Sequence, residues 1–337
     1  MQPDIFEAFR KALNSERIYT PDQLPQMIAD VRHWFRFAWT NRKLRYFDVP
    51  AAFDIETSSF LSSELNPEGV REKRACMYEW TFGLFGAVMI GRTWEEFDKM
   101  IHSLASVLDL GTEKRLIVFV HNLEFEFQFF CKRFQWTKVF AIDVRKPLYA
   151  LTDFGIEFRC SYQLSGYSLD ELGKTLTLFH DVRKAVGELD YHKIRHSETE
   201  LTDEELEYCR NDVRVVMAYI AERMQFDGSI SKLPRTKTGY VREYCRNACF
   251  YENGIRRKKS FKRLQYMQRM RGLTLTPEEY DQNKRGFAGG YTHASAFRAG
   301  ENNRGRNELR LCQLVSVRDG SGSVPMRKSG GNHRAIA

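Results

Sequence analysis

Three short segments of the sequence carry acidic residues at spacings that could hold a divalent cation. Asp54 and Glu56 lie two residues apart in FDIETSS, and the alternation of a strand places both side chains on one face. Asp212 lies in YCRND on a predicted helix, and Tyr208, four residues earlier, shares its face. Glu126 lies in HNLEFEF, at the start of a helix that follows an apolar strand. These five side chains are the candidate catalytic residues, and the four carboxylates are the candidate metal ligands.

This set of side chains suits the hydrolysis of a phosphodiester. The reaction needs an activated water and relief of charge on the leaving oxygen, and two metal ions roughly 4 Å apart serve both ends of the displacement. Mg²⁺ and Mn²⁺ prefer oxygen ligands, so carboxylates without His or Cys are suitable. We therefore expect two Mg²⁺ or Mn²⁺ ions as the cofactor. Each segment alone is more typical of a solvated face, and the prediction rests on their occurrence together.

The surrounding pattern predicts the elements that must position these residues. Residues 3–45 are expected to be helical, because Phe6, Phe9 and Leu13 recur at three- and four-residue steps. Strands are expected at 46–56, 76–85, 87–90, 116–120 and within 138–160, and helices at 93–108, 122–134 and 168–175. Thr202 and Glu205 form a capping box for a long helix that runs to about residue 224. The order favours an α/β fold with a ribonuclease-H-like layer.

Composition is that of a globular protein, with 42% hydrophobic residues and a net charge of +8. Residues 298–337 carry eight Lys/Arg and three Asp/Glu, or +5, which leaves only +3 for residues 1–297. Net charge is therefore weak support for a nucleic-acid partner. The seven cysteines are scattered without a CxxC pair, which favours reduced thiols. Neither a signal peptide nor a membrane-spanning run is visible, so we expect a cytoplasmic protein without a membrane partner.

The segments FDIET, HNLEFEF and YCRND resemble the three exonuclease motifs of family B DNA polymerases. They look most like the protein-primed polymerases of bacteriophages and linear plasmids. LDYHK (189–193) resembles a segment between the second and third motifs of those enzymes, and FAGGY (287–291) resembles the Tyr-x-Gly-Gly motif that joins their exonuclease and polymerase domains. The resemblance covers roughly residues 48–297 and implies a 3′→5′ exonuclease fold, with a bacterial cytoplasm as its location.

The resemblance also implies a role for each matching residue. Asp54, Glu56 and Asp212 match metal ligands, Glu126 matches the carboxylate of the second motif, and Tyr208 matches the tyrosine that orients the attacking water. The positions expected to contact DNA are Thr57, His121, Asn122, Phe125, Ser161, Tyr191, Gly289 and Gly290. Aromatic rings can stack on splayed bases, and amide and hydroxyl groups can hold phosphates and sugars. The implied partners are a single-stranded DNA 3′ end, primer-template DNA and a terminal protein primer.

The sequence departs from this family pattern in four places. Glu126 stands where the second motif usually has aspartate, and we expect altered activity from it more than none. Tyr162 stands where leucine is common, and Phe287 replaces the linker tyrosine. Val186 occupies the position of an expected lysine, for which Lys184 is the nearest candidate.

The palm motifs of a polymerase, DxxSLYP-like and DTD-like, do not follow FAGGY, so polymerisation is not assigned to this chain. A truncated or frameshifted reading, or a split gene with the palm on a separate polypeptide, would each explain this. The expected organisation is a helical N-terminal extension (1–45), the exonuclease domain (46–228), a basic helical segment leading to the YxGG-like motif (229–299) and a disordered or frameshifted tail (300–337). The basic stretch 253–263 is either a DNA-binding surface or a solvated helical face.

Two alternatives to a proofreading exonuclease remain open at this point. The fold could be a catalytically inactive module that binds DNA or terminal protein, with activity lost through Glu126 or truncation. It could also be a stand-alone nuclease that acts on RNA, although no residue in the sequence indicates a reader of the 2′-hydroxyl.

Overall fold

The computed structural model describes residues 3–40, 43–66, 69, 71–143, 145–182, 193–248, 251–252, 255–256 and 259–286. The chain divides into two compact units, residues 1–242 and 243–337. The division lies after residue 242, whereas the sequence suggested a domain end at 228. The carboxylates of interest all lie in the first unit, which is an α/β structure as predicted.

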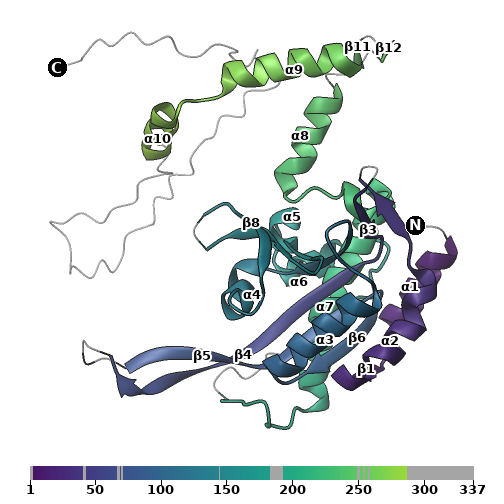
Figure 1. Ribbon diagram of the computed structural model, residues 1–337, viewed down its shortest axis with the longest axis vertical. Helices are drawn as coiled ribbons and strands as arrows, with labels where there is room; N and C mark the ends of the chain where they lie inside the picture. The colour runs from purple at the N-terminus through teal and green to yellow at the C-terminus, as the bar shows by residue number, and fades with distance from the viewer. Residues whose placement is uncertain are drawn as a thin grey trace, which may run out of the picture. The chain divides into compact units, whose positions relative to one another are not determined.

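A mixed ten-stranded sheet forms the centre of the first unit (Figure 1). Its main path runs in the order β1-β6-β5-β4-β7-β10-β9-β8, and β2 pairs with β3, which pairs with β7. The strands are β1 Ile18–Tyr19, β2 Phe37–Trp39, β3 Arg45–Phe47, β4 Ala51–Leu65, β5 Arg71–Leu84, β6 Ala87–Gly91, β7 Lys114–Val120, β8 Trp136–Ala141, β9 Pro147–Thr152 and β10 Ile156–Cys160. This arrangement is compatible with a ribonuclease-H-like layer.

Helices cover both faces of the sheet. They are α1 Pro3–Leu13, α2 Leu24–Val31, α3 Trp94–Val107, α4 Leu123–Phe130, α5 Ser161–Ser165, α6 Leu169–Thr175 and α7 Asp203–Asp227. On one face Phe53 of β4 packs against Phe97 of α3 and Phe130 of α4. On the other face the Met217 side chain of α7 lies over Gly83 of β5, where a Cβ would meet it at 2.5 Å. Successive strand residues point to opposite faces, so Asp54 faces α7.

Residues 3–45 are not uniformly helical, which corrects the prediction from periodicity. The three- and four-residue spacing of apolar residues holds in α1, where Phe9 and Leu13 are buried, and in α2. Between them β1 joins the main sheet beside β6, with Ile18 paired to Val88, and after them β2 and β3 form a hairpin. β1 and β3 pair with strands far away in the chain, β6 and β7, and a helical period in the first turns carries no information about such pairing.

The helix that carries Asp212 follows its prediction closely. Thr202 Oγ1 accepts from the backbone N–H of Glu205 at 3.2 Å, and Glu205 Oε2 accepts from the N–H of Thr202 at 2.9 Å. The helix α7 ends at Gly228, whose φ of +86° suits the left-handed end of a helix. Among the described residues, no helix combines the length and the apolar character needed to cross a bilayer.

Strands β4 and β5 extend beyond the predicted segments and form a ribbon that protrudes from the sheet (Figure 1). The described part of the second unit is short and largely helical, with β11 Tyr251–Glu252, β12 Ile255–Arg256, α9 Lys259–Leu273 and α10 Pro277–Gly286. The helix α8 Lys237–Ala248 spans the division. The basic stretch 253–263 lies wholly outside the residues whose side chains are described.

Candidate metal centre

Three predicted ligands meet between β4 and α7. One carboxylate oxygen each of Asp54, Glu56 and Asp212 lies within 4.8 Å of the others. The strand supplies the first two because they are two residues apart on one face. The long helix α7 lies across that face and supplies Asp212, which is 5% exposed. Like charges repel at this separation, so the cluster is costly without protons or cations between the oxygens.

Glu126 joins this group from a third element. It lies in the first turn of α4 and is only 4% exposed. Burial and the neighbouring Asp54 raise the pKa of Glu126 well above its ordinary value, and the pKa of Asp54 is likewise raised by burial and by Asp212. A protonated Glu126 donates a hydrogen bond to Asp54. Its second oxygen, Oε2, is buried without a hydrogen-bond partner in the described part of the chain.

A fifth carboxyl group, that of Glu79, was not predicted from the sequence. It pairs with Glu56 across the antiparallel β4–β5 register and is 1% exposed. The hydroxyl of Thr81 donates to Glu79 Oε1 at 2.5 Å, and the thiol of Cys209 on α7 also contacts the carboxylate. Burial raises the pKa of Glu79 to about 8. A lone acidic residue inside the apolar strand MYEWTFG was the available signal, because an ionised carboxylate there needs a partner.

A β-bulge follows Asp54 and Glu56. The register shifts between Glu56 and Thr57, so that Glu56 pairs with Glu79 while Thr57 pairs with Met77. The bulge changes the side-chain alternation directly after the two acidic residues, as bulges beside functional sites commonly do. Thr57, directly after the register shift, is partly buried.

Tyr208 lies one helical turn before Asp212 on α7 and is 7% exposed. That spacing places the two side chains on the same side of the helix. The tyrosine thus lies on the helix face that carries the Asp212 ligand, as its predicted role requires.

The end of β7 and the start of α4 carry the predicted DNA-contacting residues. Asn122 is exposed and adopts a left-handed backbone with φ of +71°, which asparagine tolerates better than most residues. Phe125 is 39% exposed. Ser161 is fully buried and donates to the Val120 carbonyl at 3.3 Å, while it lies 3.0 Å from His121 Nδ1. Ser161 therefore positions His121, and its predicted contact with DNA stays a prediction.

The adjacent Tyr162 is 42% exposed and lies edge-on to His121, with ring centroids 5.9 Å apart. An aromatic ring here is available for a base, at the position where the family usually has leucine. The remaining predicted contacts, Tyr191, Gly289 and Gly290, lie outside the described residues, as do Lys184, Val186 and Phe287.

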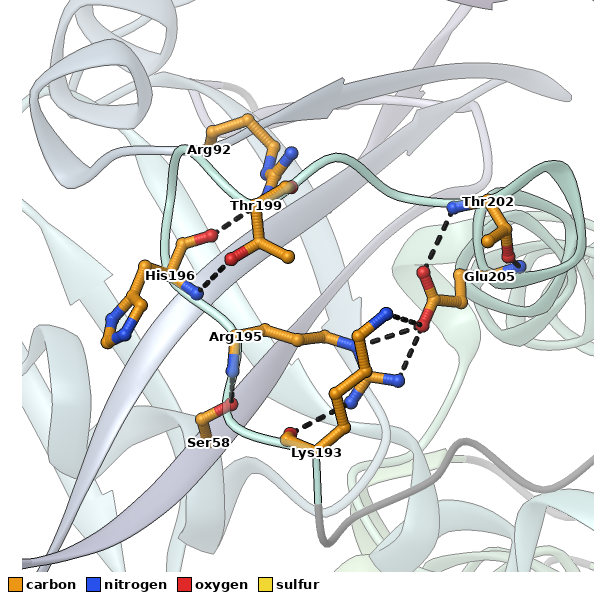
Figure 2. Close-up of polar contacts among 8 residues, drawn as sticks. All are labelled: Ser58, Arg92, Lys193, Arg195, His196, Thr199, Thr202 and Glu205. Atoms are coloured by element: carbon orange, nitrogen blue, oxygen red, sulfur yellow. Dashed lines mark hydrogen bonds and ion pairs between the residues drawn. The ribbon is translucent and has the colours of Figure 1, made fainter.

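A polar strap ties the start of α7 to β4 (Figure 2). The backbone N–H of Arg195 donates to Ser58 Oγ at 2.8 Å, two residues beyond Glu56. The guanidinium of Arg195 donates to Glu205 Oε1 through Nε and Nη2 at 2.9 and 2.5 Å. Arg92 holds the same segment by donating to the carbonyls of His196 and Thr199. These contacts fix the N-terminal end of the helix that carries Tyr208 and Asp212.

The donor set fits divalent magnesium or manganese. All of the clustered side chains offer oxygen, which hard cations prefer, and neither His nor Cys is among the three clustered ligands. Burial and neighbouring acids raise the pKa of Asp54 and of Glu126, and a bound cation would relieve the repulsion between these carboxylates. The orphaned Oε2 of Glu126 is a further available oxygen. Asp54, Glu56, Asp212 and Glu126 are thus able to hold the predicted ions.

A cavity of about 390 Å³ lies elsewhere, beside α1 and α2. Its lining includes Lys11, Arg17, Tyr19, Asp30 and Trp34, and none of the predicted site residues. It has no part in the carboxylate cluster.

No protein-family model matches the chain, and no curated protein matches it. Among solved structures, the phi29 DNA polymerase complexed with primer-template DNA and incoming nucleotides has 15% identity and a TM-score of 0.41, over 53% of this chain and 32% of the polymerase. An orthorhombic crystal form of the same polymerase has 14% identity and a TM-score of 0.40, over 56% and 32%. The chain thus matches about a third of the length of these polymerases.

Proposed function

We propose that this chain carries a metal-dependent 3′→5′ exonuclease, the proofreading portion of a protein-primed family B DNA polymerase. The observation that carries the proposal is the meeting of Asp54, Glu56 and Asp212 within 4.8 Å, with Glu126 hydrogen-bonded to Asp54. Three separate sequence motifs supply these four carboxylates. Polymerisation is not part of the proposal, and a separate palm-containing polypeptide and a terminal protein are its proposed partners.

The carboxylates would hold two Mg²⁺ or Mn²⁺ ions. When bound, such ions lower the pKa of a water and stabilise the leaving oxygen of a phosphodiester. Tyr208, one turn from Asp212, would orient the attacking water through its hydroxyl group. The buried walls around Glu126 and Glu79 exclude bulk water, which strengthens the electrostatic attraction for a cation.

A single-stranded 3′ end is the proposed substrate. Asn122 and Phe125 are exposed at the start of α4, the helix that also carries Glu126. The Phe125 ring could stack on an unpaired base for roughly 1–3 kcal/mol, and the Asn122 amide could hold a phosphate or sugar. Both contacts are independent of base identity, as proofreading requires. His121 and the exposed Tyr162 would extend this contact on the neighbouring loop.

A nuclease assay tests the proposal. Purified chain is incubated with single-stranded DNA labelled at its 5′ end, with Mg²⁺, Mn²⁺ or EDTA, beside the D54A/E56A variant. The matched control is E198A/E200A, which removes two exposed carboxylates at the same two-residue spacing. We expect stepwise shortening by the wild type and the control, and none by D54A/E56A or in EDTA.

Two outcomes would contradict the proposal. Intact DNA with both metals, together with retained DNA binding, would favour the inactive binding module and make Glu126→Asp the next variant. Faster shortening of RNA than of DNA of the same sequence would favour the stand-alone ribonuclease.

A further inference from the structure

We propose that the β2–β3 hairpin and the adjoining end of β7 form a second nucleic-acid site, which binds single strands apart from the carboxylates. Its surface consists of Phe37, Trp39, Arg45 and Lys114, named here the aromatic–basic surface. The proposal extends the nuclease function but does not depend on it, because binding can be measured without cleavage.

The sequence around this surface is unusual within the chain. Residues 31–47 (VRHWFRFAWTNRKLRYF) contain five Lys/Arg, six aromatic residues and no Asp or Glu. The first 297 residues as a whole have a net charge of only +3, so this stretch concentrates positive charge. A basic segment interleaved with aromatics is the pattern that sequence-tolerant single-strand binding uses.

The strand register places the aromatic residues on the outside. Ala38 pairs with Tyr46 and both are buried, while Phe37 and Trp39 on either side of Ala38 are 39% and 57% exposed. Alternation along β2 explains this pattern, since neighbouring residues point to opposite faces. A tryptophan with more than half of its surface in water has an open ring face for a ligand.

Cations lie directly over these rings. The guanidinium carbon of Arg45 is 4.8 Å from the Phe37 ring centroid and 5.5 Å from that of Trp39. Lys114 Nζ lies 5.7 Å from the Phe37 ring and pairs with the exposed Asp109 at 3.3 Å. Within the described residues Arg45 makes no ion pair with a carboxylate, so its charge is available to a phosphate. The rings can stack on bases while the two cations contact the backbone.

The aromatic–basic surface lies at the opposite end of β7 from the carboxylates. β3 pairs with the first residues of β7, Arg45 with Lys114, whereas Val120 at the far end pairs with Phe53, next to Asp54. Six residues of strand separate Lys114 from Val120, or about 20 Å. A strand bound here therefore contacts the protein well away from a 3′ end held at the carboxylates. Exposed rings favour single strands over duplex, whose bases are already stacked on one another.

Binding of a fluorescein-labelled (dT)20 oligonucleotide by the full chain in EDTA tests this site through fluorescence anisotropy. The variants are W39A, F37A/W39A and R45A/K114A. The matched control is R223A/F226A on α7, where the partly buried Arg223 lies 4.9 Å over the ring of the exposed Phe226. We expect W39A to raise Kd about tenfold and F37A/W39A more, while the control stays within twofold. Trp39→Phe should restore most of the W39A loss, since its ring can still stack.

The salt dependence separates stacking from charge. R45A/K114A should flatten the slope of log K against log salt concentration by about 1.4, because each phosphate contact contributes roughly 0.7 for single strands. W39A should lower affinity without changing that slope. Circular dichroism melts of each variant establish that it is folded.

Unchanged Kd and salt slope in all folded variants would overturn the proposal. A variant-dependent loss of self-association with DNA binding intact would assign the surface to a contact between copies and overturn it too. The D54A/E56A variant distinguishes this proposal from the nuclease, because it should bind (dT)20 with the wild-type dependence on Trp39.

Discussion

Two carboxylate sites, Glu157 on β10 and the group between β4 and α7, differ in the charge of their surroundings. Glu157 on β10 is 1% exposed and lies among Arg159, Arg115 and Arg235 at 2.8, 3.7 and 3.7 Å, with the Tyr46 hydroxyl donating at 2.8 Å. Burial raises its pKa, but Arg159, Tyr46 and Arg235 together outweigh this and lower it.

The carboxylates between β4 and α7 have acidic neighbours instead. For Asp54 and Glu126 the largest influences, burial and neighbouring acids, all raise the pKa. Burial also raises the pKa of the neighbouring Glu79, to about 8. The protein thus neutralises one buried acid with its own arginines and leaves the other group for protons or a cation. This difference supports the proposal that the second group is functional, because structural charges are commonly paired within the chain.

The largest expected effect concerns catalysis. Asp54→Asn should lower exonuclease activity by on the order of 10³ or more, because a metal ligand is lost while the shape is kept. Glu157→Gln should retain activity within a few-fold in the folded fraction. Rates of single-turnover DNA shortening measure both, and equal losses in the two variants would remove the distinction between the groups.

The free energy of unfolding should respond in the opposite order, with a larger loss in Glu157→Gln than in Asp54→Asn. Glu157→Gln leaves Arg159, which is 4% exposed, without its counter-charge, and should destabilise the fold by about 3–5 kcal/mol. Asp54→Asn removes repulsion in the metal-free protein and should leave the unfolding free energy unchanged or higher. Urea unfolding in EDTA provides the measurement. A larger loss for Asp54→Asn than for Glu157→Gln contradicts the comparison.

The sequence predicts the carboxylates between β4 and α7 well, but it hardly predicts the surroundings of Glu157. Strand alternation brings Asp54 and Glu56 to one face, and the Thr202–Glu205 capping box predicts the helix that carries Asp212. Motif resemblance predicts Glu126. Arg159 lies two residues from Glu157 on the same strand, but Arg115 of β7, Tyr46 of β3 and Arg235 after α7 reach it only through tertiary folding.

Two features of the fold were missed for the same reason. Glu79 reaches Glu56 only through the antiparallel β4–β5 register, and the β2–β3 hairpin depends on pairing with β7. Local periodicity carries no record of either contact. Tyr191, Gly289 and Gly290 stay predictions from the resemblance.

Bound metal should stabilise the fold only through the carboxylates between β4 and α7. Mn²⁺ at about 100 times its Kd should stabilise the wild type by about 2.7 kcal/mol, or roughly 5–10 °C in Tm for a domain of this size. The shift should be much smaller in Asp54→Asn, which loses at least one ion, and should persist in full in the active control E198A/E200A. Differential scanning fluorimetry measures it, and an equal shift in Asp54→Asn would place the metal elsewhere.

The pH dependence of metal-free stability should also separate the groups. Glu79 has a folded pKa of about 8, above its ordinary value, so the native state holds a proton that the unfolded chain releases. Stability in EDTA should therefore fall as pH rises from about 4.5 to about 8. Glu79→Gln should flatten this fall. Glu157, with a lowered pKa, should contribute only in acid, so a changed slope between pH 5 and 8 in Glu157→Gln alone would reverse the assignment.

The smallest effect is expected at Glu126. Shortening to Asp restores the residue usual in the family, and activity should change by no more than about tenfold, or about 1.4 kcal/mol. A loss as complete as that of Asp54→Asn would show that the longer side chain is required for the geometry of the centre.

Isothermal titration calorimetry of the metal-free chain with Mn²⁺ tests the central claim most directly. We predict saturable binding of two ions by the wild type and by Glu157→Gln, release of protons on binding, and loss of at least one ion in Asp54→Asn. Proton release is measured by repeating the titration in buffers of different ionisation enthalpy. Absence of saturable Mn²⁺ binding in the wild type, or identical binding in Asp54→Asn, would contradict the assignment of these carboxylates as a metal centre.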